Sequence, residues 1–349
     1  MFKPEQIPLS IPCLAGKEWE YVKDCLDTGW ISSVGKYVDE FEKSLRRYVG
    51  SKHAVACVNG TAALHISLLL AGVGLGDEVI VPTLTFISPV NTIAYLGAKP
   101  VFMDCDDHLN IDVQKTKDFL EKECEYNTRK LINKHSGRQI KALLPVHVFG
   151  QPVEIGPLVE LAEKYALKIV EDATEAIGSY YLTGKHKGKK AGSIGHFGCY
   201  SFNGNKLVST GGGGMIVTDE AELAAKARYL TTQAKDDAIR SIHDNLGYNY
   251  RLSNVAAAIG LAQMEKADEF IRIKRNNFGK YCELLADYQF IHEPEYSRSN
   301  YWFYSLILKD KEVMNVQAKL SSLGIQTRPL WRLCHTQKMY QAELAYRIE

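Results

Sequence analysis

Several kinds of sequence feature are missing from this chain of 349 residues. The eight cysteines form no Cys-x-x-Cys pair, and the ten histidines show no His-x-x-x-His spacing. These absences argue against a disulfide framework and a metal site, and they favour a reducing compartment. No apolar run reaches the length that spans a bilayer, and Met1 is followed by Phe-Lys-Pro rather than by a secretory signal. We therefore expect a cytoplasmic protein with no bound metal and no membrane partner.

An excess of one charge is also lacking, because 42 Lys and Arg residues offset 41 Asp and Glu residues for a net charge of +1. Without a global field, no nucleic acid partner is expected, and the basic run 185–190 is interpreted as a solvated loop. The phosphate loop Gly-x4-Gly-Lys-[Ser/Thr] is absent. No Gly-x-Gly-x-x-Gly opens the helix after the first predicted strand. Both absences weaken the hypothesis of a nicotinamide-dependent oxidoreductase.

Segments of strand length alternate with segments of helical periodicity through the first half of the chain. Strands are predicted at 54–58, 78–81, 100–103, 140–146 and 168–170, and helices at 61–71, 87–96, 113–123 and 158–165, with a polar break over 125–139. Strands that alternate with helices predict an α/β fold with a mostly parallel sheet covered on both faces.

The last hundred residues have a different pattern. One long helix is predicted over 252–285, followed by a strand at 301–308, a helix at 313–323 and a strand at 325–328. This order predicts a small α+β domain that the long helix joins to the rest. The expected division is a large domain over 1–250 and a small domain over 251–349.

A single lysine, Lys206, follows the strand-like run Cys199–Phe202 and precedes four consecutive glycines, 211–214. Holding four glycines in regular structure costs about 2–4 kcal/mol relative to alanine, so this backbone must need to pass close to something. A flexible surface hairpin is the alternative, but the apolar run Met215–Val217 is typical of a buried strand. A lysine between two buried strands is poorly placed as an ammonium, and a Schiff base removes that charge. Lys206 is therefore a candidate for binding a cofactor aldehyde, and the four glycines are interpreted as backbone that passes beside that cofactor.

Four further features fall at the ends of predicted strands, where open α/β sheets bind ligands. Gly60 and Thr61 begin a helix whose N-terminus favours a phosphate, although Thr61 could be an ordinary cap. Asp172 ends an apolar strand and could hold a positive ring nitrogen or cap the next helix. Ser201 could give a hydroxyl to the same phosphate, and Phe86 could stack on a flat ring or belong to the core. With the lysine, this is the inventory of side chains that binds pyridoxal 5′-phosphate (PLP).

These motifs in this order resemble those of the DegT/DnrJ-type nucleotide-sugar aminotransferases, and the resemblance covers nearly the whole chain. The branch most similar in appearance acts in legionaminic acid and bacillosamine-type pathways. Members usually extend somewhat beyond residue 349. The segments that carry the resemblance are 59–64, 77–83, 85–86, 145–150, 171–173, 200–206 and 247–252, and those that indicate the branch are 28–38, 201–206 and 229–235.

The resemblance implies an aspartate aminotransferase-like fold (fold type I) and a role for each matching residue. Lys206 would form the Schiff base with PLP, and Asp172 would pair with the pyridine nitrogen. Asn249 would reach the phosphate of the neighbouring subunit, which implies a homodimer with shared active sites. The phosphate would be held by Gly60, Thr61 and Ser201, and Phe86 would stack on the ring.

One position departs from the commoner family pattern, because Glu175 stands where many members carry Gln or His. We expect Glu175 to share a proton with the phenolic oxygen of the cofactor, since two negative charges would otherwise repel. The alternative is a helix residue that faces solvent. The diphosphate of a nucleotide sugar needs cations, for which Arg251, Arg328 and the 185–190 loop are candidates. His335 and His147 are candidates for the substrate, and all of these could equally have structural roles.

The implied reaction transfers an amino group from L-glutamate to a nucleotide-linked keto sugar. The expected acceptor is a UDP-linked 4-keto-6-deoxy-N-acetylhexosamine aminated at C4, and GDP-linked sugars stay open. A sugar dehydratase of the same fold is the nearest alternative, but those enzymes replace the cofactor lysine with histidine. A regulator that binds ligand without turnover is a further alternative, and the lack of a basic DNA-binding extension argues against it.

Overall fold

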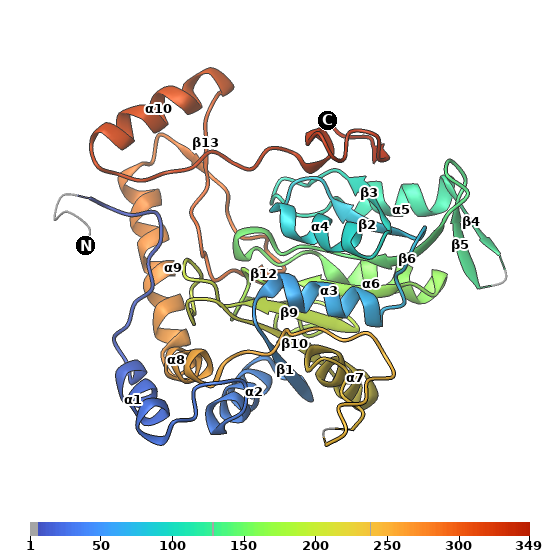
Figure 1. Ribbon diagram of the computed structural model, residues 1–349. Helices are drawn as coiled ribbons and strands as arrows, with labels where there is room; N and C mark the ends of the chain where they lie inside the picture. Colours follow the sequence, from blue (N-terminus) through green and yellow to red (C-terminus); the bar gives the residue numbers. More distant parts are fainter. Residues whose placement is uncertain (1–5, 128, 238) are drawn as a thin grey trace.

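The computed structural model describes residues 6–127, 129–237 and 239–349, and within them a ten-stranded sheet runs through the centre of the molecule (Figure 1). Adjacent strands are parallel from β9 to β14, whereas β10 pairs antiparallel with both of its neighbours. The predicted mostly parallel sheet is confirmed. Eight strands lie in the order β1 (His53–Cys57), β10 (Gly214–Thr218), β9 (Phe197–Ser201), β7 (Lys168–Asp172), β6 (Gln139–Leu143), β2 (Glu78–Pro82), β3 (Lys99–Met103) and β14 (Ala345–Tyr346).

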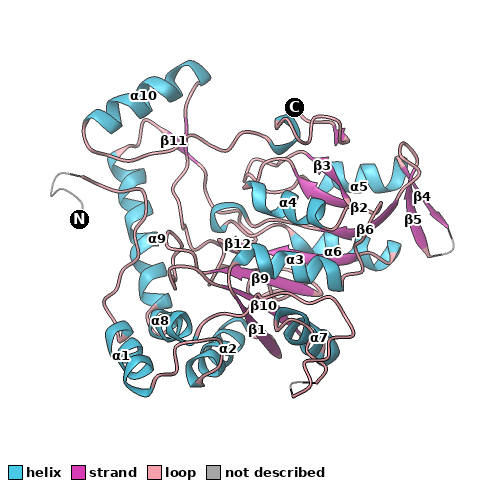
Figure 2. Ribbon diagram, viewed as in Figure 1, coloured by secondary structure: helices cyan, strands magenta, loops and turns pink. Residues whose placement is uncertain are grey.

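Helices cover both faces of this sheet, as Figure 2 shows. One face carries α3 (Gly60–Leu70), α4 (Ile87–Tyr95) and α7 (Ala221–Thr231), whose apolar side chains pack around Val55 and Val79. The opposite face carries α2 (Lys36–Val49) and α8 (Asn254–Met264) at one end, and α5 (Val113–Lys122) and α6 (Ile155–Tyr165) at the other. Because successive strand residues point to opposite faces, Ala54 and Val55 belong to different cores. A further helix, α1 (Glu18–Thr28), packs on α8.

The C-terminal part forms the upper left of Figure 1, where α9 (Ala267–Leu284) leads from α8 to α10 (Asp310–Ser322). Two short antiparallel pairs accompany them, β11 (Gln289–Phe290) with β13 (Leu306–Ile307) and β12 (Ser297–Arg298) with β8 (Tyr180–Tyr181). The last strand, β14, returns to the large sheet beside β3, so the end of the range 251–349 lies with the large domain. None of the helices in the described ranges is long and apolar enough to cross a membrane.

The prediction of one helix over 252–285 is wrong, because α8 and α9 are separated at Glu265 and Lys266. The end of α8 is tied down by polar contacts. The Gln263 amide donates to the Cys13 carbonyl at 2.7 Å and to Glu18 Oε1 at 2.6 Å, and the Tyr21 hydroxyl donates to Glu265 Oε1 at 2.6 Å. Neither proline nor glycine marks this break, so helical periodicity alone could not locate it.

Three other expectations also differ from the structure. The polar segment 125–139 contains most of an antiparallel hairpin, β4 (Cys124–Asn127) with β5 (Lys130–Asn133), which extends the sheet next to β6. The strand expected over 301–308 is reduced to β13, because residues 299–304 are held in a loop by side-chain contacts described below. The strand expected over 325–328 is a single bridge from Ile325 to Ile7.

Candidate active site

Lys206 lies in the turn that follows β9, in the middle of the sheet. Its backbone N–H donates to the Asn203 carbonyl at 2.9 Å, which closes the turn. The amine Nζ donates to Glu175 Oε1 at 3.0 Å, and the two side chains are only 14% and 5% exposed. The lysine is therefore a largely buried amine whose partner at this distance is a carboxylate.

Asp172 ends the neighbouring strand β7 and is 2% exposed. Burial raises the pKa of Asp172 to about 6, although hydrogen bonds from Thr174 oppose the rise and the charge of Glu175 adds to it. The backbone N–H of Thr174 donates to Asp172 Oδ1 at 3.0 Å. A buried carboxyl of this kind is stabilised by a positive partner, and a protonated pyridine nitrogen is one.

The N-terminus of α3 faces Ser201 across a narrow gap that only glycine leaves open. A Cβ atom on Gly60 would lie 2.8 Å from Ser201 Cβ and 3.1 Å from Thr174 Cγ2. Asn59 caps the helix by accepting the Ala62 N–H at 2.7 Å, and the Thr61 hydroxyl lies 2.6 Å from the hydroxyl of Ser88. Free backbone N–H groups, the helix dipole and a ring of hydroxyls suit a phosphate.

The four glycines after Lys206 have a different cause from the one expected. A Cβ atom on Gly214 would overlap the backbone of Asn59, and one on Gly213 would overlap the hydroxyl of Thr210. Gly211 has a φ of +79°, which side chains rarely adopt. Gly214 therefore lets β10 pass beside the chain's own loop before α3, and the tight contacts of this run are to the chain itself.

Glu175 is buried, so the alternative of a helix residue facing solvent is wrong. Its Oε1 accepts a hydrogen bond from Lys206 Nζ, and its Oε2 accepts one from the backbone N–H of Phe149 at 2.9 Å. Phe149 adopts the left-handed region with a φ of +52°, and this conformation accompanies the N–H contact with the carboxylate. Both oxygens are thus engaged next to the lysine. The shared proton with a cofactor oxygen stays a prediction.

An aromatic cluster lies beside Lys206, and the sequence predicts only one of its members. Phe86 is 54% exposed at the start of α4, with its ring 6.1 Å from that of Trp331. Trp331 lies 4.7 Å from Phe149, and Phe149 lies 6.1 Å from Trp302. Phe303 stacks on Trp302 at 3.8 Å. The tryptophans come from segments about a hundred residues downstream of the lysine, and no periodicity or motif marks them as neighbours of it.

Other predicted site residues have partners of their own. Arg251 Nη1 donates to Glu42 Oε1 and to the Ala56 carbonyl, each at 3.2 Å, and His335 Nδ1 lies 2.7 Å from the Thr83 hydroxyl. Asn249 and Arg328 are exposed; Asn249 forms a β-bridge with Thr232, and Arg328 Nη1 donates to the Thr327 carbonyl at 2.9 Å.

His147 is fully buried and has structural partners on both ring nitrogens. Its Nε2 lies 3.1 Å from Glu171 Oε2, and its Nδ1 accepts the Val153 N–H at 3.0 Å. The candidate substrate role of His147 therefore has no support in this chain.

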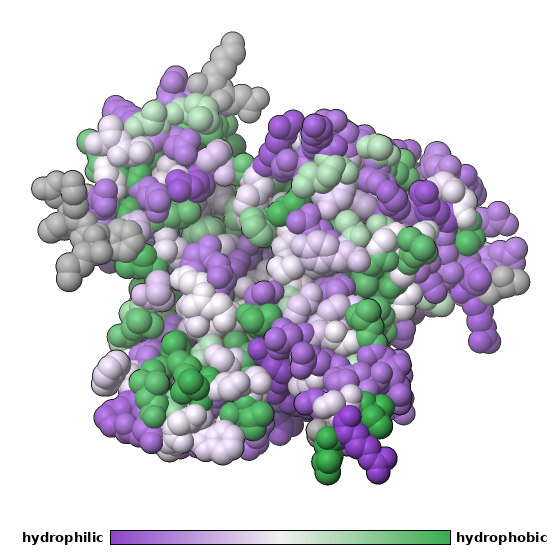
Figure 3. All heavy atoms as spheres, in the orientation of Figure 1, coloured by the Kyte–Doolittle hydropathy of each residue, from purple (hydrophilic) through white to green (hydrophobic). Residues whose placement is uncertain are grey.

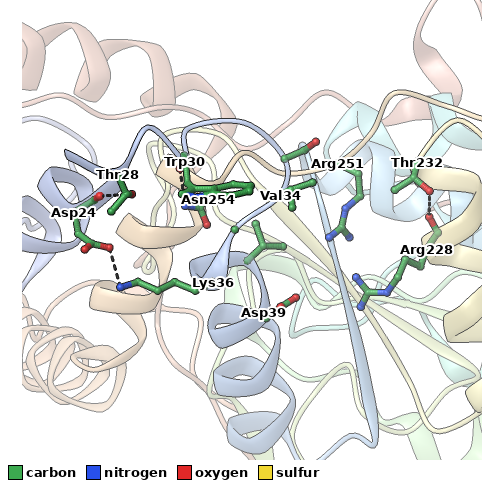
Figure 4. Close-up of a pocket in the computed structure, with 13 residues that line it drawn as sticks. Asp24, Thr28, Trp30, Val34, Lys36, Asp39, Arg228, Thr232, Arg251 and Asn254 are labelled. Atoms are coloured by element: carbon green, nitrogen blue, oxygen red, sulfur yellow. Dashed lines mark hydrogen bonds and ion pairs between the residues drawn. The ribbon is translucent and has the colours of Figure 1, made fainter. Parts of the chain in front are cut away.

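A pocket of about 560 Å³ lies between the segment 24–39, α7 and the start of α8 (Figure 4). Its lining includes none of Lys206, Asp172 and Glu175. The cations that line it are paired, Lys36 with Asp24 at 2.8 Å and both Arg228 and Arg251 with Glu42. The pocket therefore presents balanced charge, and it does not by itself indicate an anion-binding site.

The residues around Lys206 fit PLP. The glycine gap and the hydroxyls between α3 and Ser201 would hold its phosphate, and Asp172 would hold its ring nitrogen. Phe86 would cover its ring, and the amine of Lys206 is available to its aldehyde. The geometry brings these predicted residues together with Thr174, Ser88 and Phe149, which the sequence did not single out.

Comparisons with known proteins identify the family of this chain. The model of the DegT/DnrJ/EryC1/StrS aminotransferase family matches residues 12–348. GDP-perosamine synthases of Caulobacter vibrioides and Escherichia coli O157:H7 are 39% and 40% identical over 347 and 336 residues, each covering 96% of this chain and 87% of the relative. A solved structure of a DegT DnrJ EryC1 StrS aminotransferase from Brucella abortus is 28% identical with a TM-score of 0.85, covering 95% of this chain and 85% of that one.

Proposed function

Because the chain belongs to the DegT/DnrJ/EryC1/StrS aminotransferase family, whose cofactor is PLP, we propose that it transfers the amino group of L-glutamate to C4 of a GDP-linked 4-keto-6-deoxyhexose. The observation that carries the reaction class is a largely buried Lys206, paired with Glu175, whose charge also acts on the buried Asp172. The names of the similar proteins support the GDP-linked acceptor. The narrower expectation of a UDP-linked acceptor in a legionaminic acid or bacillosamine pathway is not supported by those names, and it becomes an outcome of the test.

Each residue of the site has a task in this proposal. PLP, when bound, supplies an electron sink for the carbanion that forms next to the transferred amine. Asp172 holds the proton on the ring nitrogen, which keeps that sink effective. The amine of Lys206, when neutral, would take the proton from one carbon and return it to another. Glu175, within hydrogen-bond distance of Lys206, can take up or supply the proton that the lysine exchanges.

We further propose that the functional unit is a homodimer in which Asn249 completes the site of the partner. Exposed apolar side chains next to the pocket of Figure 4 support this, and Figure 3 shows an apolar region over the same lower left part of the molecule. These side chains are Leu26, Trp30, Ile31 and Val34, each more than half exposed. A solvent-exposed cluster of this kind marks an interaction surface.

The test of the acceptor uses purified protein, PLP, ¹⁵N-labelled L-glutamate and a panel of GDP- and UDP-linked 4-keto-6-deoxy sugars. The proposal expects ¹⁵N at C4 of the GDP-linked sugar, with no transfer by Lys206→Ala. Amination of the UDP-linked N-acetyl sugar alone would overturn the GDP assignment and support the legionaminic acid or bacillosamine alternative. Loss of a hydroxyl without nitrogen transfer would identify a dehydratase instead.

The test of the shared site mixes two inactive variants, Lys206→Ala and Asn249→Ala, after unfolding and joint refolding. A mixed dimer holds one site in which both residues are wild type, so activity should return on mixing. Sedimentation of each variant alone checks that both still form dimers. No recovery from well-formed mixed dimers would contradict a site built from two subunits.

A further inference from the structure

The indole ring of Trp302 lies over the amine of Lys206. Lys206 Nζ is 3.9 Å from the ring centroid, and Trp302 is 2% exposed. On its other side the same nitrogen donates to Glu175 Oε1 at 3.0 Å. The amine is therefore enclosed between the face of an aromatic ring and a carboxylate, out of contact with most solvent.

Trp302 is fixed in this position by three hydrogen bonds. Its indole Nε1 donates to the carbonyl of Asn205, the residue before the lysine, at 2.8 Å. Its backbone N–H donates to Asn300 Oδ1 at 2.9 Å, and its carbonyl accepts from Lys274 Nζ at 2.9 Å. The ring can therefore move away from Lys206 only if several contacts break together.

The segment that carries Trp302 is tied to the turn that carries Glu175. The Asn300 amide donates to the carbonyls of Glu175 and Ile177 at 2.9 and 3.0 Å. The Ser299 hydroxyl donates to the Gly150 carbonyl at 3.0 Å. The ring and the carboxylate thus belong to one connected frame, with the lysine amine between them.

Both contacts favour the same protonation form. A carboxylate attracts an ammonium, and the negative face of an indole attracts it too, most strongly when the pair is desolvated. Attack on an aldehyde requires the neutral amine with its lone pair. The enclosure therefore gives the amine, when it carries a proton, a fixed place between the ring face and the carboxylate.

We propose that Trp302 is a positioning residue that holds the ammonium form of Lys206 against Glu175 between successive bonds to the cofactor. This proposal rests on the assignment of Lys206 as the cofactor lysine. In the transfer reaction the lysine leaves the cofactor and carries a proton between two carbons. The indole face gives that charged form a fixed place from which the proton can be returned.

Two other ionisable groups bear on the enclosure. The charge of Lys206 acts on Asp172 of β7, which lies on the sheet side of the amine. Lys274 of α9 donates to the carbonyl of Trp302 at 2.9 Å, and burial lowers the pKa of Lys274. Glu175 and Trp302 both lie in direct contact with Lys206 Nζ.

The test measures how fast cofactor-free protein takes up PLP as a function of pH, followed by the visible band of the lysine-bound cofactor. Because uptake needs the neutral amine, its rate rises with pH to a plateau. The midpoint is the pH at which the rate is half of that plateau. Trp302→Leu keeps the apolar volume and removes the ring face. Loss of a desolvated cation–π contact in this variant should lower the midpoint by about one pH unit. On the acidic limb, uptake should then be about tenfold faster relative to the plateau rate. Trp302→Phe, which keeps a smaller ring, should fall between the two.

Trp19→Leu is the matched control, because Trp19 is 76% exposed on α1 and has no contact with Lys206. Urea unfolding of each cofactor-free variant shows whether the fold is intact. A midpoint unchanged in folded Trp302→Leu and Trp302→Phe would overturn the role of Trp302. Failure of the wild-type protein itself to form the visible band would instead overturn the proposed function, so the two failures are distinct.

Discussion

The gap between α3 and Ser201 allows a sharp test of where the phosphate of PLP binds. In Gly60→Ala the added Cβ would lie 2.8 Å from Ser201 Cβ and 3.1 Å from Thr174 Cγ2. The first distance is about 0.7 Å or more below an ordinary carbon contact of about 3.5–4.0 Å, so the helix N-terminus or β9 must shift. That shift displaces the N–H groups and the hydroxyl that would face the phosphate.

The expected loss is large for cofactor binding and small for folding. Displacing one charge-assisted hydrogen bond costs about 1.5–3 kcal/mol, which weakens PLP binding about 10- to 150-fold. The free energy of unfolding of the cofactor-free protein should change less. Overpacking costs about 1–3 kcal/mol, and replacing a helical glycine by alanine restores about 0.5–1 kcal/mol.

The assay titrates cofactor-free protein with PLP and follows the visible band, with urea unfolding measured in parallel. Gly212→Ala is the matched control, because a Cβ there meets nothing within 4 Å and should leave the affinity unchanged. Wild-type affinity in Gly60→Ala would refute the reasoning, since it would show that the phosphate does not lie between α3 and Ser201.

Three further predictions concern charge and packing around the site. Asp172→Asn should raise the free energy of unfolding of the cofactor-free protein at pH 8 by up to about 3 kcal/mol, because the pKa of Asp172 rises from 3.8 to about 6 on folding. Asp172 binds its proton more tightly in the folded than in the unfolded protein, so the stability gained by Asp172→Asn shrinks as the pH falls through 6 and disappears near pH 4. A stability gain in urea unfolding that does not depend on pH would contradict this. Glu175→Gln should move the pH titration of the visible band to lower pH by removing a negative charge, and an unchanged titration would mean that Glu175 does not touch the cofactor. Gly150→Ala should destabilise the fold by about 1–3 kcal/mol more than Gly137→Ala in urea unfolding. Both glycines have positive φ, but only the Cβ at Gly150 would overlap the Asn300 side chain. Equal losses of stability would argue against that contact.

Much of the site could be predicted from the sequence because its chemistry is carried by short local motifs. Lys206, Asp172, Gly60 and Ser201 each stand at the end of a strand, and a parallel sheet brings such ends to one edge. The alternation of strands and helices could likewise be predicted up to β7, since apolar strand runs and helical periodicity are local signals.

What the sequence missed depends on contacts between distant segments. Trp302 is close to Lys206 because Asn300 ties its segment to the turn of Glu175, while Lys274 ties the same segment to α9. The break at Glu265 follows from contacts between Gln263 and the N-terminal segment, with no local breaker residue. The sequence favours a cofactor as the neighbour of the glycine run, whereas its tight contacts are to Asn59 and Thr210 of the same chain.

The central claim is that Lys206 binds PLP and performs amino transfer. Its most direct test records the visible spectrum of the PLP-loaded protein before and after addition of L-glutamate, with 2-oxoglutarate measured in the same sample. The account predicts a band of lysine-bound cofactor that disappears on addition of L-glutamate, one 2-oxoglutarate formed for each site converted, and neither signal in Lys206→Ala. A protein that forms no visible band with PLP, or a Lys206→Ala variant that gives the same spectrum and product, would contradict it.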